Sequence, residues 1–211
     1  MERTPSTGGQ ARQRAAAATR ERILAAAAAL LAEYGSPKTT IAMVARQAGV
    51  AAGTVYLHFP DREALLREVL ADALSQLKLA LAEVASERAE RSAAADVRRR
   101  TEGLVAFAAN HAELAAVLFH PTHLVTPAGR EALEFLVASQ AAALTEGQAR
   151  HWVRPDLEPL LAGRALVGSL LQVLGWWVDR RRSGQIAPDP VDVAAQLANL
   201  RLYGTAVRPR E

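Results

Sequence analysis

The sequence lacks cysteine entirely, and only 5% of its 211 residues are aromatic. Without thiols the chain cannot hold a disulfide scaffold, a thiolate zinc site, an iron–sulfur cluster or a cysteine nucleophile. There is no signal-peptide core and no apolar run of about 18 residues, so we expect a cytoplasmic protein without a membrane span. Few aromatic residues, together with alanine at about a fifth of the positions, favour helices over sheets.

The formal net charge of +3 is unevenly distributed along the chain. Residues 1–62 carry eight Lys or Arg against four Asp or Glu, whereas residues 63–211 carry 17 against 18. A basic first third on a near-neutral body indicates that this part meets a polyanion. A basic tail that only aids solubility would give the same numbers, so charge alone leaves both interpretations open.

The spacing of apolar residues predicts an all-α fold of about nine helices, with no strand pattern. Residues 1–18 lack apolar periodicity and are expected to form a flexible basic arm. Ordered helix should begin near Thr19 and end at Gly35. Two short helices separated at Gly49 should follow, and then a long connecting helix capped by Asp61. Further helices are expected at about 96–109 and 111–120, from Pro127 towards Trp152, from Asp156 to Ser183 and Gly184, and after Asp189.

Residues 40–59, TIAMVARQAGVAAGTVYLHF, have the pattern of a helix-turn-helix. Glycine is expected in the turn at Gly49, where the backbone can need a positive φ. Ala45 is small where the two helices cross, and Val50 and Val55 would fill the space between them. The second helix would enter the major groove of DNA. An ordinary helical hairpin has a similar pattern, so the motif alone is only moderately specific.

Four segments extend this pattern: EYG at 33–35, TTIAMVARQAGV at 39–50, GTVYLHF at 53–59 and DREALL at 61–66. Together they resemble the tetracycline-repressor (TetR) family of DNA-binding regulators. The resemblance covers about a quarter of the chain. It implies a helix-turn-helix DNA-binding domain over 19–62 and a helical ligand-binding and dimerisation domain over 63–211. It also implies a ligand-responsive transcriptional regulator, most often a repressor.

The candidate DNA contacts combine hydroxyl, amide and basic side chains with residues at a helix N-terminus, where N–H groups and the helix dipole favour an anion. They are Lys38, Thr39, Thr40, Arg46, Gln47, Ala51, Ala52, Gly53, Thr54, Tyr56, His58 and Arg62. A solvated polar residue is the alternative interpretation for each polar member of this set. Family members usually carry Lys at the position of Arg62, and Arg keeps the charge and the ability to bond a phosphate.

Direct base readout should be limited, because the reading helix begins with Ala51, Ala52 and Gly53. Ala42 also stands where some family members have a base-reading Arg. Alanine methyls and Thr54 can contact a thymine methyl. Much of the remaining specificity is therefore expected to come from DNA shape and half-site spacing within a palindromic operator.

A single short reading helix gives weak specific binding, so a two-fold homodimer is expected. The candidate interface lies on the last two long helices and consists of Val167, Leu170, Leu171, Leu174, Val193, Leu197 and Leu200. Alternatively, these apolar stripes close the core of each monomer.

An effector pocket is expected among the middle helices. Its candidate lining residues are Phe107, His111, Leu114, Phe119, His123, Phe135, Gln140, Trp152, Trp176 and Trp177. Because they are mostly apolar, we expect an apolar or aromatic small molecule. Plain core packing is the alternative for each of them.

No pattern indicates catalysis, a metal or a cofactor. His120 and His123 flank Pro121 without a carboxylate cluster, and no glycine-rich phosphate loop follows a strand. We therefore expect a regulator that is not an enzyme, with double-stranded DNA and a small-molecule effector as its partners. A sequence-tolerant DNA-packaging protein and a small helical enzyme are the alternatives.

Overall fold

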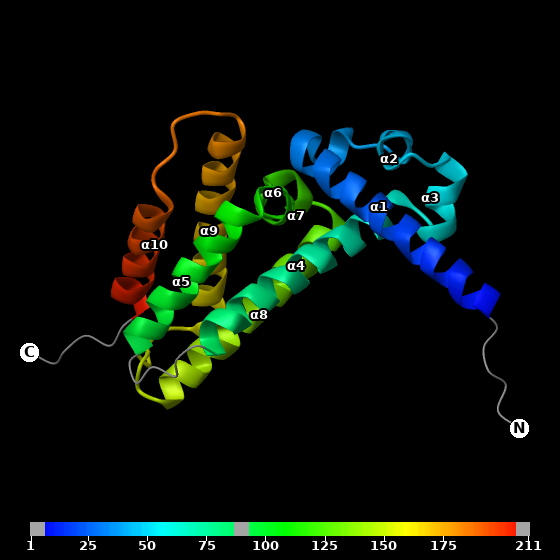
Figure 1. Cartoon of the computed structure of the whole chain (residues 1–211). Coiled ribbons are helices and arrows are strands. Elements are labelled where there is room, and N and C mark those ends of the chain that lie inside the picture. Colours follow the sequence, from blue (N-terminus) through cyan, green and yellow to red (C-terminus); the bar gives the residue numbers. More distant parts are fainter. Residues whose placement is uncertain (1–6, 87–92, 206–211) are drawn as a thin grey trace, which may run out of the picture.

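The computed structural model describes residues 7–86 and 93–205, which form ten helices and no strand (Figure 1). The helices are α1 (Thr7–Lys38), α2 (Ile41–Ala48), α3 (Ala52–His58), α4 (Arg62–Ser86), α5 (Ala93–Asn110), α6 (Ala112–Phe119), α7 (Pro121–Leu124), α8 (Pro127–Ala149), α9 (Pro159–Arg182) and α10 (Pro190–Thr205). The all-α class is therefore confirmed. The helix that the sequence pattern missed is α7, a single turn too short to show periodicity.

Helix α1 begins earlier than the sequence predicts. Residues 7–18 are helical, and the side chains from position 9 to 18 are exposed. The segment 11–18, ARQRAAAA, consists of residues with high helix propensity, so the helix continues outward without burying a face. The expected flexible arm is therefore wrong for 7–18, as is the expected helix start at Thr19, whereas 1–6 lie outside the described residues. Figure 1 shows this end of α1 projecting beyond the rest of the molecule.

Helices α1, α2 and α3 form a small N-terminal unit. The Thr40 hydroxyl caps α2 by accepting the Met43 N–H at 3.3 Å, and Gly49 ends α2 with a φ of 67°. Val44 of α2 and Val55 of α3 are fully buried between the helices. These features confirm the helix-turn-helix geometry that the sequence predicts.

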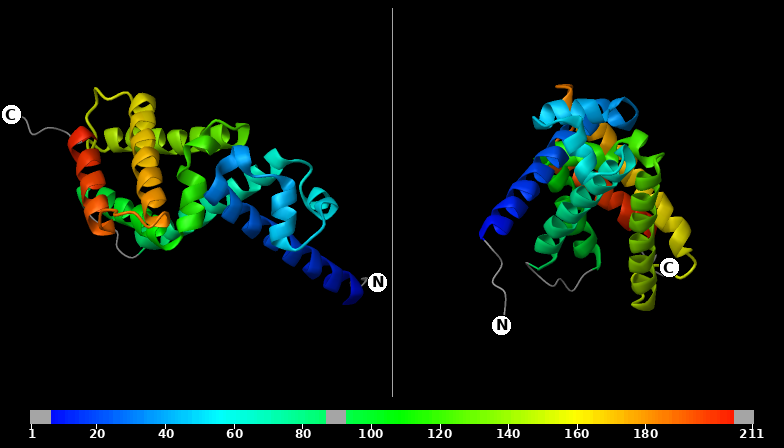
Figure 2. Two further views of the ribbon diagram at one scale, coloured as in Figure 1. Left: turned by 90° about the horizontal axis from the view of Figure 1, so that it is seen from above. Right: turned by 90° about the vertical axis from the view of Figure 1, so that its right-hand side faces the viewer.

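Helix α4 leads from this unit into the C-terminal helices, beginning with an N–H of Ala64 donated to the Asp61 carboxylate at 2.7 Å. There α4 packs against α5 and α8, α9 packs against α8 and α6, and α10 packs against α5. Figures 1 and 2 agree that α1–α3 lie at one end of the molecule and α9 and α10 at the other.

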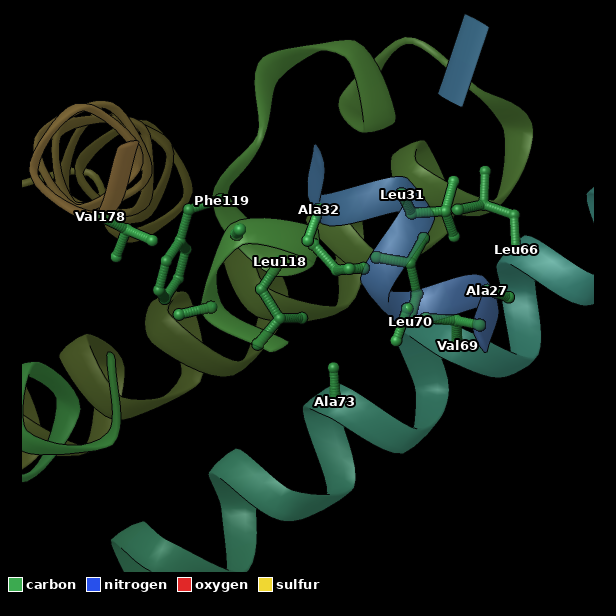
Figure 3. Packing of buried hydrophobic residues seen from close by; sticks show 14 of the residues in the cluster. Ala27, Leu31, Ala32, Leu66, Val69, Leu70, Ala73, Leu118, Phe119 and Val178 are labelled. Atoms are coloured by element: carbon green, nitrogen blue, oxygen red, sulfur yellow. The ribbon is translucent and has the colours of Figure 1, made fainter. Parts of the chain in front are cut away.

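One hydrophobic core connects the two ends. Figure 3 shows Leu31 of α1 beside Leu66 and Leu70 of α4, while Phe119 of α6 faces Val178 of α9. All five side chains are at most 5% exposed. Helix α6 packs directly on α1 and on α9, so it lies between the N-terminal helix and the far end of the molecule.

Helix α9 differs from expectation in two respects. Its N-cap is Glu158, whose carboxylate accepts the N–H groups of Leu160 and Leu161, rather than Asp156. By length and composition α9 also qualifies as a possible membrane span, as do α5 and α6 if that pair, bent by 112°, is counted as one span. Leu174 and Trp177 of α9 are fully buried against neighbouring helices, so we assign α9 to the protein core.

Candidate nucleic-acid interface

The turn between α2 and α3 is held rigidly on α1. Within the turn, the Gly49 N–H donates to the Arg46 carbonyl at 3.2 Å. From α1, the Arg22 guanidinium donates to the carbonyl of Ala48 and, at 3.2 Å, to that of Gly49. These bonds satisfy carbonyl groups at the end of α2 and tie the start of the turn to α1. Sequence reasoning missed Arg22, because a basic side chain on α1 carries no sign that it reaches a turn 27 residues away.

Most of the candidate DNA contacts are exposed. The exposed members are Lys38, Thr40, Arg46, Gln47, Ala51, Ala52, Gly53, Tyr56 and Arg62, and the half-buried members are Thr54 and His58. At Gly53 an added Cβ would meet no atom within 4 Å, so the start of α3 is open to a large partner.

Leu57 on α3 was not among the candidates and is 85% exposed, next to Tyr56 at 54%. Both side chains lie on the same seven-residue helix as the predicted DNA contacts, so a partner on this face would cover them. Helical spacing alone could have placed Leu57 on this face.

Thr39 does not belong to this surface. It is 3% exposed, and its single hydroxyl proton is shared between the carbonyls of Leu30 at 3.2 Å and Gly35 at 2.9 Å. The prediction of a DNA contact at Thr39 is therefore wrong, because its side chain is buried and its hydroxyl bonds carbonyl groups of α1 near the kink at Gly35.

Arg62 has an internal role in addition to its predicted one. Its guanidinium donates to the hydroxyl of Ser36, a buried residue after the α1 kink, at 2.8 Å. Since a guanidinium has five N–H donors, this bond leaves others for a phosphate, and the DNA contact of Arg62 stays a prediction.

A cavity of about 320 Å³ lies where α1, α6, α7 and α9 meet. The lining residues are Ala32, Ala116, Phe119, His120, Pro121, Leu171, Gln172, Gly175, Trp176, Val178, Asp179 and Arg182. Of the predicted pocket residues, Phe119 and Trp176 line it.

The structure does not bring the other predicted pocket residues to this cavity. Phe107, His123 and Trp177 are fully packed in the core. Phe135 and Trp152 instead form exposed cation–π pairs. The Nζ of Lys78 lies 3.9 Å from the ring centroid of Phe135, and the Cζ of Arg150 lies 5.0 Å from that of Trp152. His111 is exposed and stacks on Phe107, the half-buried Gln140 accepts a hydrogen bond from Arg201, and Leu114 packs against the core.

Two histidines stand at the α6–α7 corner. His120 accepts hydrogen bonds at Nδ1 from the N–H and the hydroxyl of Thr122. His123 is fully buried, and its Nδ1 lies 2.7 Å from the Val117 carbonyl. Burial lowers the pKa of both imidazoles, although the Val117 carbonyl raises that of His123. Over 7–86 and 93–205, no group of three potential ligand side chains could hold a metal ion.

Most side chains of the predicted dimer interface are buried inside the single chain. Val167, Leu171, Leu174, Val193 and Leu197 are at most 7% exposed in the single chain, and Leu170 is half-buried. These residues therefore belong to the core of the single chain, as the alternative interpretation of the apolar stripes has it. Of the predicted interface residues, only Leu200 is exposed, at 58%.

Known transcriptional regulators are similar to this chain in sequence and in fold. Residues 23–69 match the family model described as bacterial regulatory proteins, tetR family. An uncharacterised helix-turn-helix transcriptional regulator of Mycobacterium bovis is 33% identical over 139 residues, which cover 63% of this chain and 68% of that protein.

Solved structures extend the likeness of fold to almost the whole chain. A TetR-family transcription regulator from Marinobacter aquaeolei has a TM-score of 0.70 and 22% identity, covering 93% of this chain and all of that one. The regulator FadR of Bacillus subtilis, solved with stearoyl-CoA, has a TM-score of 0.71 and 24% identity, covering 87% and 98%. The motifs at 33–66, the helix-turn-helix geometry and these matches agree, and the chain belongs to the TetR family of transcriptional regulators.

Proposed function

We propose that this chain is a cytoplasmic repressor that binds a palindromic operator as a homodimer and releases it when a small apolar or aromatic molecule binds. The observation that carries the proposal is the open surface formed by the end of α1 together with α2 and α3. It presents Lys38, Arg46 and Tyr56 beside a reading helix that begins with small exposed residues. We assign 19–62 to DNA binding, with the helical segment 7–18 as its extension, and 63–211 to effector binding and dimerisation.

The side chains of this surface divide between positioning and reading. Lys38 and the Tyr56 hydroxyl would bond phosphates, as would the N-terminus of α2 at Thr40. Thr54 and the methyls of Ala51 and Ala52 would touch base edges, so specificity should depend mainly on shape and half-site spacing.

The proposed dimer uses the outward faces of α9 and α10. On α9 the exposed positions Leu161, Gly168 and Gln172 recur at helical spacing, and a Cβ at Gly168 would meet nothing within 4 Å. On α10, Leu200 and Tyr203 are 58% and 83% exposed. A second copy packed on these faces would bury this apolar surface.

Sedimentation at micromolar concentration tests the dimer. The wild type is expected to sediment as a dimer, and Gly168→Glu as a monomer, because a buried carboxylate without a partner is costly. Ala142→Glu, on an exposed position of α8, is the matched control and should leave the dimer intact. A monomeric wild type would contradict the proposal.

The effector is proposed to be smaller than the stearoyl-CoA bound by the Bacillus subtilis regulator. The cavity of about 320 Å³ is at the lower end of the usual range for small-molecule sites. Its occupant can favour release only through a higher affinity for the state that does not bind the operator.

The salt dependence of DNA binding tests the surface itself. Lys38→Ala should weaken binding to every DNA sequence and flatten the slope of log affinity against log salt by about one unit. Tyr56→Phe should weaken binding without changing the slope, because it removes a hydrogen bond and no charge. Lys78→Ala removes the same charge from α4 and serves as the matched control. An unchanged slope for Lys38→Ala would remove Lys38 from the interface.

A further inference from the structure

The α6–α7 corner is enclosed by glycines from three helices. A Cβ on Gly175 of α9 would lie 2.6 Å from the Phe119 carbonyl oxygen, and one on Gly129 of α8 would lie 1.8 Å from that of His123. A Cβ on Gly35 of α1 would lie 2.8 Å from the Thr122 hydroxyl. Three helices therefore touch residues 119–123 without slack, and one of them is α1 of the DNA-binding unit.

The cavity described above opens beside this corner. Figure 3 shows three of its wall residues, Ala32 of α1, Phe119 of α6 and Val178 of α9. Trp176 adds an aromatic wall, and its indole is 45% exposed. Ala116, Pro121 and Leu171 extend this apolar wall, whereas His120, Gln172, Asp179 and Arg182 supply its polar groups. The body of an occupant against the apolar part should be an aromatic or other apolar group.

Arg182 gives the cavity a direct connection to the DNA-binding unit. It lies in the last turn of α9, lines the cavity, and donates from Nη1 to the carbonyl oxygen of Ala32 in α1. An occupant that accepts a hydrogen bond from Arg182 would engage the same guanidinium that holds this carbonyl, and would so act on the link between α9 and α1.

Asp179 stands one turn before Arg182 on the same wall. No ion pair of its carboxylate is found among the described residues. The wall thus offers one acidic acceptor and one basic donor side by side, and the imidazole of His120 is the third titratable group there. For an anion or a cation, attraction to one of these two groups is offset by repulsion from the other, whereas a neutral head group that both donates and accepts can bond both.

We propose that this cavity is the effector site, and that it binds a small uncharged aromatic molecule whose phenol or primary amide head accepts from Arg182 and donates to Asp179. The inference rests on the proposed function, in which a small molecule controls DNA binding. It adds the location of the site, the class of ligand and the bond through which binding reaches α1.

Calorimetric titration of the full chain with three biphenyls tests the ligand class. The probes are para-phenylphenol, para-phenylbenzoate and para-phenylbenzylamine, which share their rings and differ in head-group charge. The phenol should bind at least about tenfold more tightly than the other two. Tighter binding of the benzoate or the amine, or no binding of the phenol, would overturn the proposal.

Two variants locate the site. Arg182→Met should lose about tenfold in phenol affinity, whereas Arg181→Met, which removes the same charge from the same turn but does not line the cavity, should lose little. Asp179→Asn removes the acidic group, so para-phenylbenzoate should then bind more tightly than the phenol. Circular dichroism establishes that each variant is folded. An unchanged ligand preference in Asp179→Asn would overturn the proposal even if Arg182→Met failed to fold.

DNA binding with and without the probe separates this inference from the proposed function. Saturating para-phenylphenol should weaken DNA binding by the wild type at least about fivefold, and should leave DNA binding by Arg182→Met unchanged. If the chain binds DNA but none of the biphenyls, the proposed function stands and this inference is contradicted. If it binds the phenol but no DNA, the proposed function is contradicted and the assignment of the site stands.

Discussion

The reading helix and the α6–α7 corner use small residues for opposite purposes. At the start of α3, a Cβ on Gly53 would have nothing within 4 Å, while on α8 a Cβ on Gly129 would lie 1.8 Å from a carbonyl oxygen. The first glycine leaves room for a partner outside the molecule, and the second lets two segments of backbone touch. In an alanine-rich helical chain, glycine therefore stands both on an open helix surface and where two backbone segments meet.

The largest expected effect comes from exchanging these two glycines for alanine. Gly129→Ala should lower the free energy of unfolding by about 3 kcal/mol or more, because backbone must move to admit the methyl group. Gly53→Ala should raise it by about 0.5–1 kcal/mol, since alanine is the better helix former. Chemical denaturation followed by circular dichroism measures both. Equal effects at the two positions would show that the corner is not tightly packed.

A second contrast lies within the DNA-binding unit, between neighbouring residues. Thr39→Val removes a buried hydroxyl that serves two carbonyl groups, so the free energy of unfolding should fall by about 1–2 kcal/mol. Lys38→Ala should leave it within about 0.5 kcal/mol, because the side chain is exposed. The salt slope of DNA binding should respond in the reverse order, changing for Lys38→Ala and not for Thr39→Val. If the slope changed for Thr39→Val instead, the boundary between interior and interface would be misplaced.

The corner should also make stability depend on pH, with a smaller effect. Burial lowers the pKa of His123 and of His120 below the ordinary value of 6.5. Between the folded and unfolded pKa values the unfolded chain binds more protons, so stability is complete above about pH 6.5 and declines as the pH falls below it. His123→Asn keeps an N–H donor near the Val117 carbonyl but cannot titrate. Its melting temperature should fall less than that of the wild type between about pH 7.5 and about pH 5.5. An equal decline in both proteins would exclude His123 as the cause.

The smallest effect on stability is expected at Leu57, which lies on the reading helix α3. Leu57→Ala should change the free energy of unfolding by less than about 0.5 kcal/mol, because the side chain is 85% exposed. DNA affinity should nevertheless fall, since the leucine would be covered in the complex. Val55→Ala, two residues earlier on the same helix and fully buried, is the matched control that loses stability. Unchanged DNA affinity in Leu57→Ala would leave this exposed leucine outside the interface.

The short helices can be predicted because neighbouring residues in the sequence determine where they begin and end. Thr40 caps α2, Gly49 ends it with a positive φ, and Asp61 caps α4 after Pro60. Each signal acts within about four residues, so no tertiary information is needed. The start of α1 was predicted wrongly because apolar periodicity was required of a segment that is helical through propensity alone.

The cavity and the proposed dimer face could not be predicted in the same way, because both depend on which side of a helix meets its neighbours. Trp176 and Trp177 are adjacent in sequence, yet one lines the cavity and the other is fully buried. The most apolar faces of α9 and α10 are buried in the core of the single chain, so the proposed dimer uses their less apolar faces. Nothing in the local sequence indicates the hydrogen bond from Arg182 to α1, because its partner Ala32 lies 150 residues away.

The most direct test of the account is selection of bound DNA from a random pool, followed by a competition assay between the selected site and random DNA. A regulator of this kind should select a palindrome with two half-sites and prefer it over random DNA by about 10³-fold or more. Selection of no common sequence, with near-equal affinity for all DNA, would contradict the account and favour a DNA-packaging protein.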